Sequence, residues 1–429
     1  MFRNRISRIC RIAIQPRRHS SQLSSIYPLT KLRAYPFKLS PEEAIVQLAP
    51  HASVLCVFKD LIGSLGARFL PGFGFEPLRP LRISPVYFPG WIIDTQLSAE
   101  VRYDDVQRTA SGIIHDSYLP GSDFPVLSWV SYFPHGSPVA AVPFTKDLEV
   151  QHGVEINCLP YKISPFAALD IARSLSYRDA TIGDVHFSPR SIETQLLAAY
   201  PVLFPLYLAQ YELRTAPDAK PRFVTLFIEA FEAKGRIRAQ ASNLGRDLRE
   251  MLPAFAPQNL VDWTQAIDAV DVQILRGQPG PFFTVAGFST PERRGIGMAL
   301  ADWLNTLVVH HDAAPKLAEK SGTISSDADP RIRPFSPEEQ ARNTQWMLLG
   351  VEIESTKRVV SSMKDIDLDK AHIVVMGNKK GRSQEIFKST ISSLESKIQE
   401  LEAKREESTP SWWKEWLEMS RTAPGKEHS

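Results

Sequence analysis

Polar and apolar side chains alternate along residues 95–103, which read TQLSAEVRY. The odd-numbered positions from Leu97 to Tyr103 are apolar, and the even-numbered positions from Gln96 to Arg102 are polar. A period of two with one polar face is typical of a half-buried antiparallel strand. We therefore expect a strand over residues 83–103.

Residues 196–211, LLAAYPVLFPLYLAQY, contain no charged side chain. The segment is 16 residues long, shorter than the roughly 20 that cross a bilayer, and it holds two prolines. A transmembrane helix is thus disfavoured. Because proline cannot donate to a sheet ladder, we expect a buried strand with a kink at the edge of a sheet.

One phrase is written twice in these two segments. Residues 85–91 read PVYFPGW and residues 201–207 read PVLFPLY, an offset of 116. Each phrase puts Pro-Val and Phe-Pro in front of an apolar continuation that enters a predicted strand. The repetition predicts an internal duplication, in which the prolines limit pairing and the aromatic rings fill the core.

Other periodic segments complete the predicted fold. Pro41, Glu42 and Glu43 follow Ser40 as a helix start, with Ser40 as the N-cap. The remaining predictions are a helix to Gly66, a strand over Val126–Phe133, a helix over 164–178, a hairpin over Arg222–Ala241, a strand over Pro281–Phe288 and a helix over Gly297–His310. Together they predict an α+β fold with duplicated antiparallel β-rich halves and packed helices.

The C-terminal part predicts a helical arm. A helix begins after Ser336 and runs to about Met363, and a short heptad seam follows before the Trp-rich tail TPSWWKEWLEM. The seam and the tail supply candidate partner-docking residues: Phe387, Ile391, Leu394, Ile398, Leu401, Trp412, Trp413 and Trp416. Three partners stay open for the tail, namely a protein groove, a membrane interface and the core of the chain itself.

These features divide the chain into five predicted parts. They are a transit peptide and disordered lead over 1–34, a first α+β half over 35–190, a second half over 191–315, a linker over 316–336 and the helical arm over 337–429.

The first residues, MFRNRISRICRIAIQPRRHSS, predict a mitochondrial transit peptide. They are rich in arginine, contain serine, lack acidic residues and place apolar side chains at helical spacing. We expect processing near Ser20 and Ser21. A basic arm for nucleic acid or anionic lipid is the alternative.

Removal of this segment changes the charge argument. The chain carries a formal net charge of +2, and six arginines lie in residues 1–20, so a chain starting near Ser21 carries −4. Such a chain lacks the charge expected of a general nucleic-acid binder, and we expect nucleic-acid contact only through a larger complex. The three cysteines, Cys10, Cys56 and Cys158, form neither a disulfide framework nor a CxxC metal motif.

Candidate chemistry is sparse. Gly377–Ser383 is a basic turn without Walker spacing, and His310–Asp312 offers adjacent rather than convergent metal ligands. Four acids lie near predicted strand ends, where solvated positions are the default: Asp94, Glu100, Asp104 and Asp105. We therefore predict no catalytic residue, no metal ligand and no cofactor.

The loop FLPGFGFEPLRP, residues 69–80, is rich in glycine, proline and phenylalanine. Two interpretations stay open for it. The aromatic side chains contact a membrane surface, or they fold back into the core.

The segments PVYFPGWIID and LLAAYPVLFPLYLAQYEL resemble a pattern in uncharacterised bacterial proteins, in which a zinc ribbon precedes two related β-rich halves. The resemblance covers roughly Ile83–Ala241. It implies a duplicated α+β scaffold, but the ribbon is absent here, so the resemblance implies no metal site or catalytic residue for this chain.

These observations predict a non-catalytic mitochondrial factor for assembly, scaffolding or ribosome association. We expect it in the matrix or on the matrix face of the inner membrane, with a protein complex as partner and peripheral membrane contact. The alternative is an enzyme or small-ligand binder with a pocket between the duplicated halves, because distant residues can build a site without a local motif.

Overall fold

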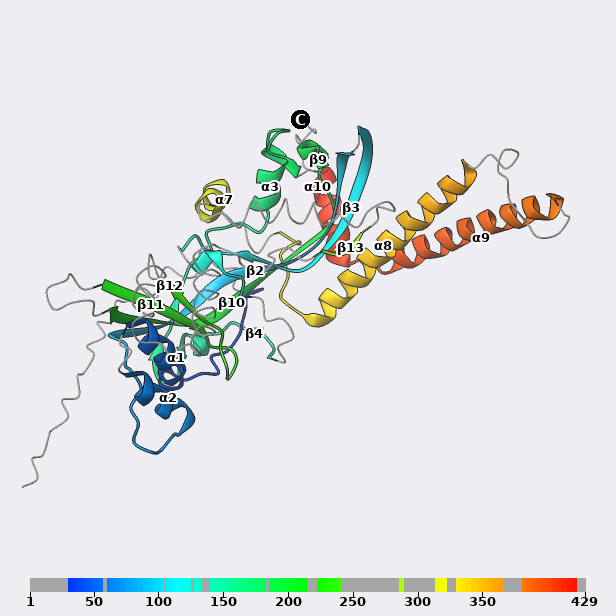
Figure 1. The fold of residues 1–429 in the computed structure, drawn as a ribbon. Coiled ribbons are helices and arrows are strands. Elements are labelled where there is room, and N and C mark those ends of the chain that lie inside the picture. Colours follow the sequence, from blue (N-terminus) through cyan, green and yellow to red (C-terminus); the bar gives the residue numbers. More distant parts are fainter. Residues whose placement is uncertain are drawn as a thin grey trace, which may run out of the picture.

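The computed structural model of the chain has a long sheet through its body, helices against that sheet and two long helices that extend from one end (Figure 1). The predicted α+β class is confirmed. The described residues are 30–56, 60–103, 105–124, 127–132, 139–182, 185–213, 222–240, 285–288, 313–321, 329–365 and 380–422.

Two long strands, β2 (Arg82–Tyr103) and β10 (Glu193–Leu213), form the centre of the sheet. Each pairs with the strand of its own hairpin, β3 (Val106–Pro120) with β2 and β11 (Arg222–Glu229) with β10. The order is β12 (Ile237–Gln240), β11, β10, β2, β3 and β13 (Val285–Phe288). The predicted strand over 83–103 and the predicted hairpin over 222–241 are therefore confirmed.

The remaining strands are short. They are β1 (Arg33–Ala34), β4 (Val142–Pro143), β5 (Val150–Gln151), β6 (Val154–Glu155), β7 (Asn157–Cys158), β8 (Thr181–Ile182), β9 (Val185–Phe187), β12 (Ile237–Gln240) and β13 (Val285–Phe288).

The two proline-aromatic phrases lie directly opposite each other in the sheet. β2 and β10 are antiparallel, and Phe88 pairs with Phe204, which holds the same position in the phrase. A local pseudo-twofold axis thus passes between these two phenylalanines. Residues 85–91 and 201–207 are all buried, so a ligand pocket has no room between the two phrases.

The prolines occupy central strands, so the predicted edge position is wrong. The hairpin pairing of β2 begins at Gly90, and that of β10 begins at Leu206. These are equivalent positions of the phrase, and both prolines of each phrase precede them. The missing N–H groups therefore fall where the outer neighbour is only a two-residue strand, and few ladder hydrogen bonds are lost.

The outer neighbours extend the pseudo-symmetry. β1 pairs in parallel with Val202 and Leu203 of β10, and β7 pairs in parallel with the equivalent Val86 and Tyr87 of β2. Each short strand leads into a repeated sequence, PFKLSP at 36–41 and PYKISP at 160–165. Each repeat thus adds a short strand to the long strand of the other.

The last aromatic of each phrase fastens this exchange. The Trp91 indole N–H donates to the Ile163 carbonyl at 2.8 Å, and the Tyr207 hydroxyl donates to the Leu39 carbonyl at 2.9 Å. Leu39 and Ile163 hold the same place in the repeated sequence. The predicted duplication is therefore observed for these elements.

The boundaries of the two predicted halves need correction. The first repeat runs from β1 to β3 and the second from β7 to β11, so the division lies between residues 120 and 157 rather than at 190. Leu32 and Ala34 are buried, and β1 pairs with β10. Residues 30–34 therefore belong to the body and not to a disordered lead.

The small helices also depart from prediction in places. Ser40 caps α1 (Pro41–Cys56) as expected, with its backbone N–H and its hydroxyl bonded to Glu43, but a second helix, α2 (Leu61–Phe69), follows instead of one continuous helix. The helix predicted at 164–178 is α3 (Ala167–Ser174). Residues Leu127–Trp129 form a 3-10 helix, as do Lys146–Glu149 and Pro189–Ser191, so the strand predicted over 126–133 is wrong.

The predicted linker is partly integrated into the body. Leu317 of α7 (Ala313–Ser321) is buried. Ile332 is also buried and forms a parallel bridge with Ala199 of β10. These contacts make residues 316–321 and 329–336 part of the packed body.

The C-terminal helices are α8 (Pro337–Lys364), α9 (Lys380–Glu407) and α10 (Ser411–Thr422). α8 begins after Ser336 as predicted, and Ser336 caps it, because its side chain accepts from the Glu339 backbone N–H. α8 and α9 pack side by side and extend beyond the sheet, and we call this pair the arm (Figure 1). α10 turns back to the body.

Among the described residues, none of the helices is long and apolar enough to cross a membrane. Several predictions lie outside the described residues, including the transit peptide with Ser20 and Ser21, the helix over 297–310, His310–Asp312 and most of Gly377–Ser383.

Candidate functional site

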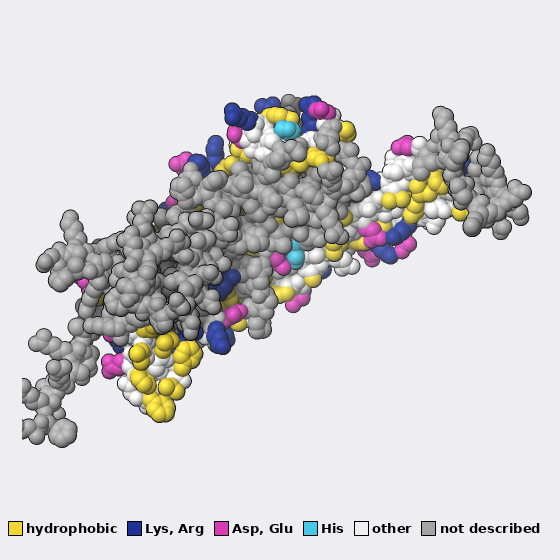
Figure 2. Space-filling view, in the orientation of Figure 1, with side chains coloured by type: hydrophobic (Ala, Val, Ile, Leu, Met, Phe, Trp, Pro, Cys, Tyr) yellow, Lys and Arg dark blue, Asp and Glu magenta, His cyan; other side chains and the backbone are white. Residues whose placement is uncertain are grey.

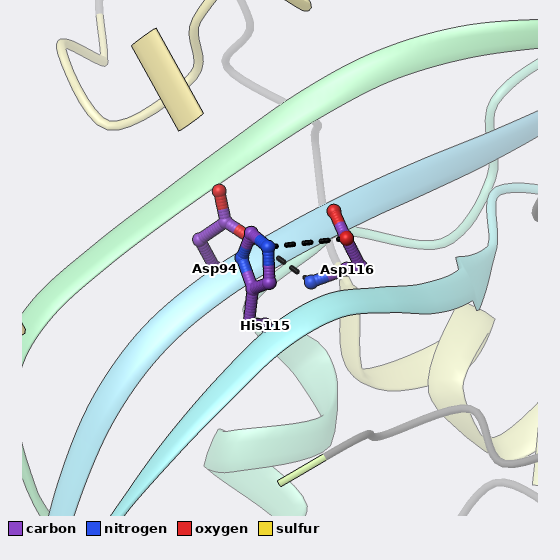
Figure 3. A group of neighbouring side chains, drawn as sticks. All are labelled: Asp94, His115 and Asp116. Carbon is purple, nitrogen blue, oxygen red and sulfur yellow. Dashed lines mark hydrogen bonds and ion pairs between the residues drawn. The ribbon is translucent and has the colours of Figure 1, made fainter. Parts of the chain in front are cut away.

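One polar cluster lies where β2 and β3 meet the root of the arm. Asp94 projects from β2, and His115 and Asp116 project from β3 (Figure 3). Irregular pairing between β2 and β3 falls at Ile93–Thr95, next to Asp94, and Asp116 has a positive φ of 49°. The local irregularity brings consecutive side chains of β3 to one place, which regular alternation would separate.

The His115 ring lies between the two carboxylates. Its Nδ1 is 2.9 Å from Asp94 Oδ1, and its Nε2 is 3.1 Å from Asp116 Oδ2 (Figure 3). Burial of the ring lowers the pKa of His115, but hydrogen bonds and charge from Asp116 and Asp94 outweigh it and raise this pKa to about 10. The ring is thus an imidazolium at neutral pH.

Helix α8 closes the cluster from above the sheet. The Gln340 side-chain amide donates to Asp94 Oδ2 at 3.3 Å and to Asp116 Oδ1 at 3.0 Å. Thr344 Oγ1 lies 3.2 Å from His115 Nδ1. Asp94 is fully buried, and the Gln340 amide, the His115 ring and the Asp116 backbone N–H replace the water that its carboxylate loses.

A second contact from α8 reaches β10. The Asn343 side-chain amide donates to the Tyr200 hydroxyl at 2.8 Å, and both side chains are buried. Burial raises the pKa of Tyr200, and the charges of Asp94 and Glu339 raise it further. The first three turns of α8 are thus fixed to both long strands.

A groove of about 500 Å³ opens beside the cluster. It is lined by His115 and Asp116 from β3 and by one side of α8. The α8 residues lining it include Gln340, Thr344, Leu348 and Glu352. The cluster is therefore reached from solvent through its His115–Asp116 side.

The cluster has the donor types of a divalent-cation site. One nitrogen and two carboxylate oxygens from Asp94, His115 and Asp116 lie within 4.8 Å of one another. Such a mixed set suits transition metals such as Mn²⁺ or Zn²⁺. As a general base the histidine is poorly placed, because both ring nitrogens already face carboxylates and the raised pKa keeps the ring protonated.

Arg405 of α9 makes the other fastening of the arm. Its guanidinium donates to Gln96 of β2 at 3.1 Å and to Gln195 of β10 at 3.3 Å, and it stacks 3.9 Å over the centre of the Trp346 ring. A Cβ added at Gly350 would lie 2.6 Å from this guanidinium. Glycine at 350 therefore makes room for the arginine.

Seven of the eight predicted docking residues pack against other parts of the chain. Ile398 and Leu401 are buried against Ile353 and Val360 of α8, with Ile391 and Leu394 packed beside them. Phe387 is partly exposed nearer the start of α9. In the tail, Trp412 and Trp413 are buried in the main core, and Trp416 stacks on Trp413 at 4.5 Å.

Sequence reasoning placed Asp94 near a strand end but missed its partners. His115, Asp116 and Gln340 come from segments that are distant in sequence or that read as ordinary strand and helix. The available signal was His-Asp inside the apolar run IIHDSYL, where two consecutive polar residues break a strand pattern. Glu100 accepts a hydrogen bond from Gln107, away from the cluster.

No protein-family model, curated protein or solved structure matches this chain. The resemblance to bacterial two-half proteins therefore stays a prediction.

Proposed function

We propose that the protein is a non-catalytic mitochondrial assembly, scaffold or ribosome-associated factor that contacts its partner complex with the α8–α9 arm. The observation that carries the proposal is the projection of this arm beyond the sheet (Figure 1). Among the described residues, the arm is fastened to the body at Gln340, Asn343 and Arg405. Farther along α8, Arg358 donates to the Thr109 carbonyl of β3 at 3.5 Å. The Arg-rich start of the sequence supports import into mitochondria.

The two helices of the arm are held together along their length. Its two helices share an apolar seam that includes Ile353 and Ile398. Three ion pairs of 2.7–2.8 Å flank this seam, joining Lys357 to Glu402, Lys364 to Glu395 and Lys397 to Glu352. Exposed pairs contribute little stability one by one, but together with the seam they fix the register of the two helices.

Exposed apolar side chains on the arm supply the proposed contact. Val359 and Ile386 are 48% and 59% exposed. Charge at these positions leaves the seam intact and removes the apolar surface. The test compares the mature chain with the Val359→Glu/Ile386→Glu double variant. The matched control is Val106→Glu, at a similarly exposed valine on β3.

Native purification from mitochondria with mass spectrometry of the bound proteins is the measurement. We expect one reproducible set of proteins with the wild type and the control, and loss of that set with the arm variant. Equal recovery by the arm variant would refute the role of the arm. Removal of residues 384–429 is a less clean test, because it also deletes the buried Trp412 and Trp413.

A second candidate function, binding of a divalent cation or small ligand, is favoured by the convergence of Asp94, His115 and Asp116 beside a groove. Titration with Mn²⁺, followed by electron paramagnetic resonance, tests it. Binding by the wild type and by Glu100→Gln, with loss in Asp116→Asn, is the expected outcome for a cation site. Absence of binding by the wild type would refute this candidate function, and the cluster would then serve only to hold α8 on the sheet.

A further inference from the structure

Helix α2 exposes large apolar side chains and buries small residues, the reverse of a typical surface helix. Its buried residues are the small Ser64 and Gly66, whereas Ile62 and Phe69 are 78% and 67% exposed. Ser64 is held inside by hydrogen bonds from its hydroxyl to Ser53 and from the Leu78 N–H. Surface helices normally bury their large apolar side chains, so this orientation needs an explanation outside the body.

The loop after α2 continues the exposed apolar surface. Gly72 and Gly74 have φ values of +91° and +81°, which non-glycine residues rarely adopt, and they turn the chain sharply on either side of Phe73. Phe75 folds back onto Gly66, where an added Cβ would lie 2.4 Å from its ring. Phe73 points outward and is 77% exposed.

These residues form one apolar protrusion. Figure 2 shows it as a cluster of hydrophobic side chains over α2 and the following loop, at the end of the molecule away from the arm. We call it the α2 protrusion. Its exposed apolar residues are Ile62, Phe69, Leu70, Phe73 and Phe75.

We propose that the α2 protrusion inserts into the surface of a phospholipid membrane. The protrusion is convex and formed by a turn, a shape that enters the yielding acyl region of a bilayer without a preformed groove. Residues 61–82 contain three arginines and one glutamate, and Arg79 is paired with Glu42 of α1 at 3.4 Å. Arg68, next to Phe69, is therefore the cation that we expect to meet an anionic headgroup. Arg68 lies 5.5 Å from the centre of the Phe69 ring, next to the inserting side chains.

The inference goes beyond the proposed function and does not depend on it. It assigns the body a membrane contact at the end opposite the arm. Of the two interpretations left open for the FLPGFGFEPLRP loop, the exposure of Phe69 and Phe73 favours the membrane surface.

Flotation of the mature chain with vesicles tests the proposal. The probes are phosphatidylcholine vesicles with and without an anionic phospholipid. We expect binding to both, stronger with the anionic lipid. Phe69→Asn and Phe73→Asn each remove a large apolar side chain from the contact, so each should weaken partitioning by about tenfold or more, and the double variant by about a hundredfold.

The matched control is Phe223→Asn, because Phe223 is 51% exposed on β11, outside the protrusion. Wild-type protein that stays unbound to both vesicle types would overturn the proposal, as would a double variant that floats like the wild type. Analytical sedimentation tests whether the protrusion instead contacts a second copy of the chain. If the wild type does not float but forms a dimer, and the double variant does not dimerise, the protrusion is a dimer contact. The Val359→Glu/Ile386→Glu arm variant should bind vesicles normally, which keeps the two proposals separable.

Discussion

The long strands β2 and β10 contain the same phrase but continue from it into different surroundings. Around the pseudo-twofold axis, both bury their aromatic residues, and both fasten the short strand and the repeated PFKLSP or PYKISP segment of the other repeat. Farther along, Asp94 on β2 corresponds to Gln210 on β10 at the same offset of 116. Only Asp94 belongs to the cluster that receives α8.

This difference distinguishes the residues that hold the two repeats together from those that bind α8. Where the repeats agree, their residues hold each other in place, as Trp91 and Tyr207 do through equivalent hydrogen bonds. Where they disagree, the chain attaches an element outside the repeats, namely the arm. The repeated phrase is therefore a structural element, and the part of β2 around Asp94, which differs from β10, is the candidate functional region.

The largest expected effect comes from breaking the shared anchors. Trp91→Ala and Tyr207→Ala each remove a buried aromatic ring and its hydrogen bond, so each should lower the free energy of unfolding by about 3–5 kcal/mol. Urea unfolding followed by circular dichroism measures both. A large loss at one position and almost none at its equivalent would contradict equal roles for the two repeats.

Replacement of His115, which belongs to the cluster found on one repeat only, should have the next largest effect on the free energy of unfolding. The folded pKa of His115, about 10, lies above the ordinary histidine value of 6.5, so the stabilisation from its charged ring is complete below pH 6.5 and is lost as pH rises to about 10. The full shift corresponds to about 5 kcal/mol, and solvent screening of the partly exposed ring reduces it, so His115→Gln should cost about 3 kcal/mol at pH 6 and little at pH 10. Unfolding of wild type and variant across this range is the measurement, and a pH-independent difference between them would show that the ion cluster is not the cause.

Loss of the Arg405 contacts between the arm and the sheet should have the third largest effect on the free energy of unfolding. Arg405→Met keeps the length of the side chain over Trp346 but removes its hydrogen bonds to Gln96 and Gln195. We expect a loss of about 1–3 kcal/mol and faster amide exchange near the start of α8 and the end of α9. Gly350→Ala should act in the same direction by pushing the guanidinium away. Unchanged exchange in both variants would argue against Arg405 as a fastening.

The smallest effect is expected on the α2 protrusion. Phe69→Asn and Phe73→Asn alter mostly exposed side chains, so the free energy of unfolding should change by less than about 0.5 kcal/mol. Thermal unfolding without vesicles checks this. A large destabilisation would show that the phenylalanines serve the fold rather than an external surface.

Local patterns were sufficient to predict much of the fold. Alternation predicted β2, serine-proline starts predicted α1 and α8, and the repeated phrase predicted a duplicated sheet. The position of the prolines was not predictable from propensity alone, because their tolerance depends on where β3 and β11 begin to pair. The exchange of β1 and β7 between repeats is likewise a long-range pairing that leaves no local period.

The candidate site was less accessible from the sequence. Asp94, His115 and Gln340 are brought together by a strand irregularity and by the docking of α8, and neither is encoded at a fixed spacing. The Trp-rich tail shows the opposite problem. Trp412 and Trp413 look exposed on a short amphipathic segment, yet the body offers the apolar surface that buries them.

Cross-linking of lysines in intact mitochondria, followed by mass spectrometry, tests most directly that the asymmetric arm carries the function. Lys364 and Lys388 lie on the arm, and Lys38 and Lys162 lie on exposed positions of the two repeats. We expect cross-links to other proteins to concentrate at Lys364 and Lys388 and to be rare at Lys38 and Lys162. Cross-links concentrated on the repeats, with none from the arm, would contradict it.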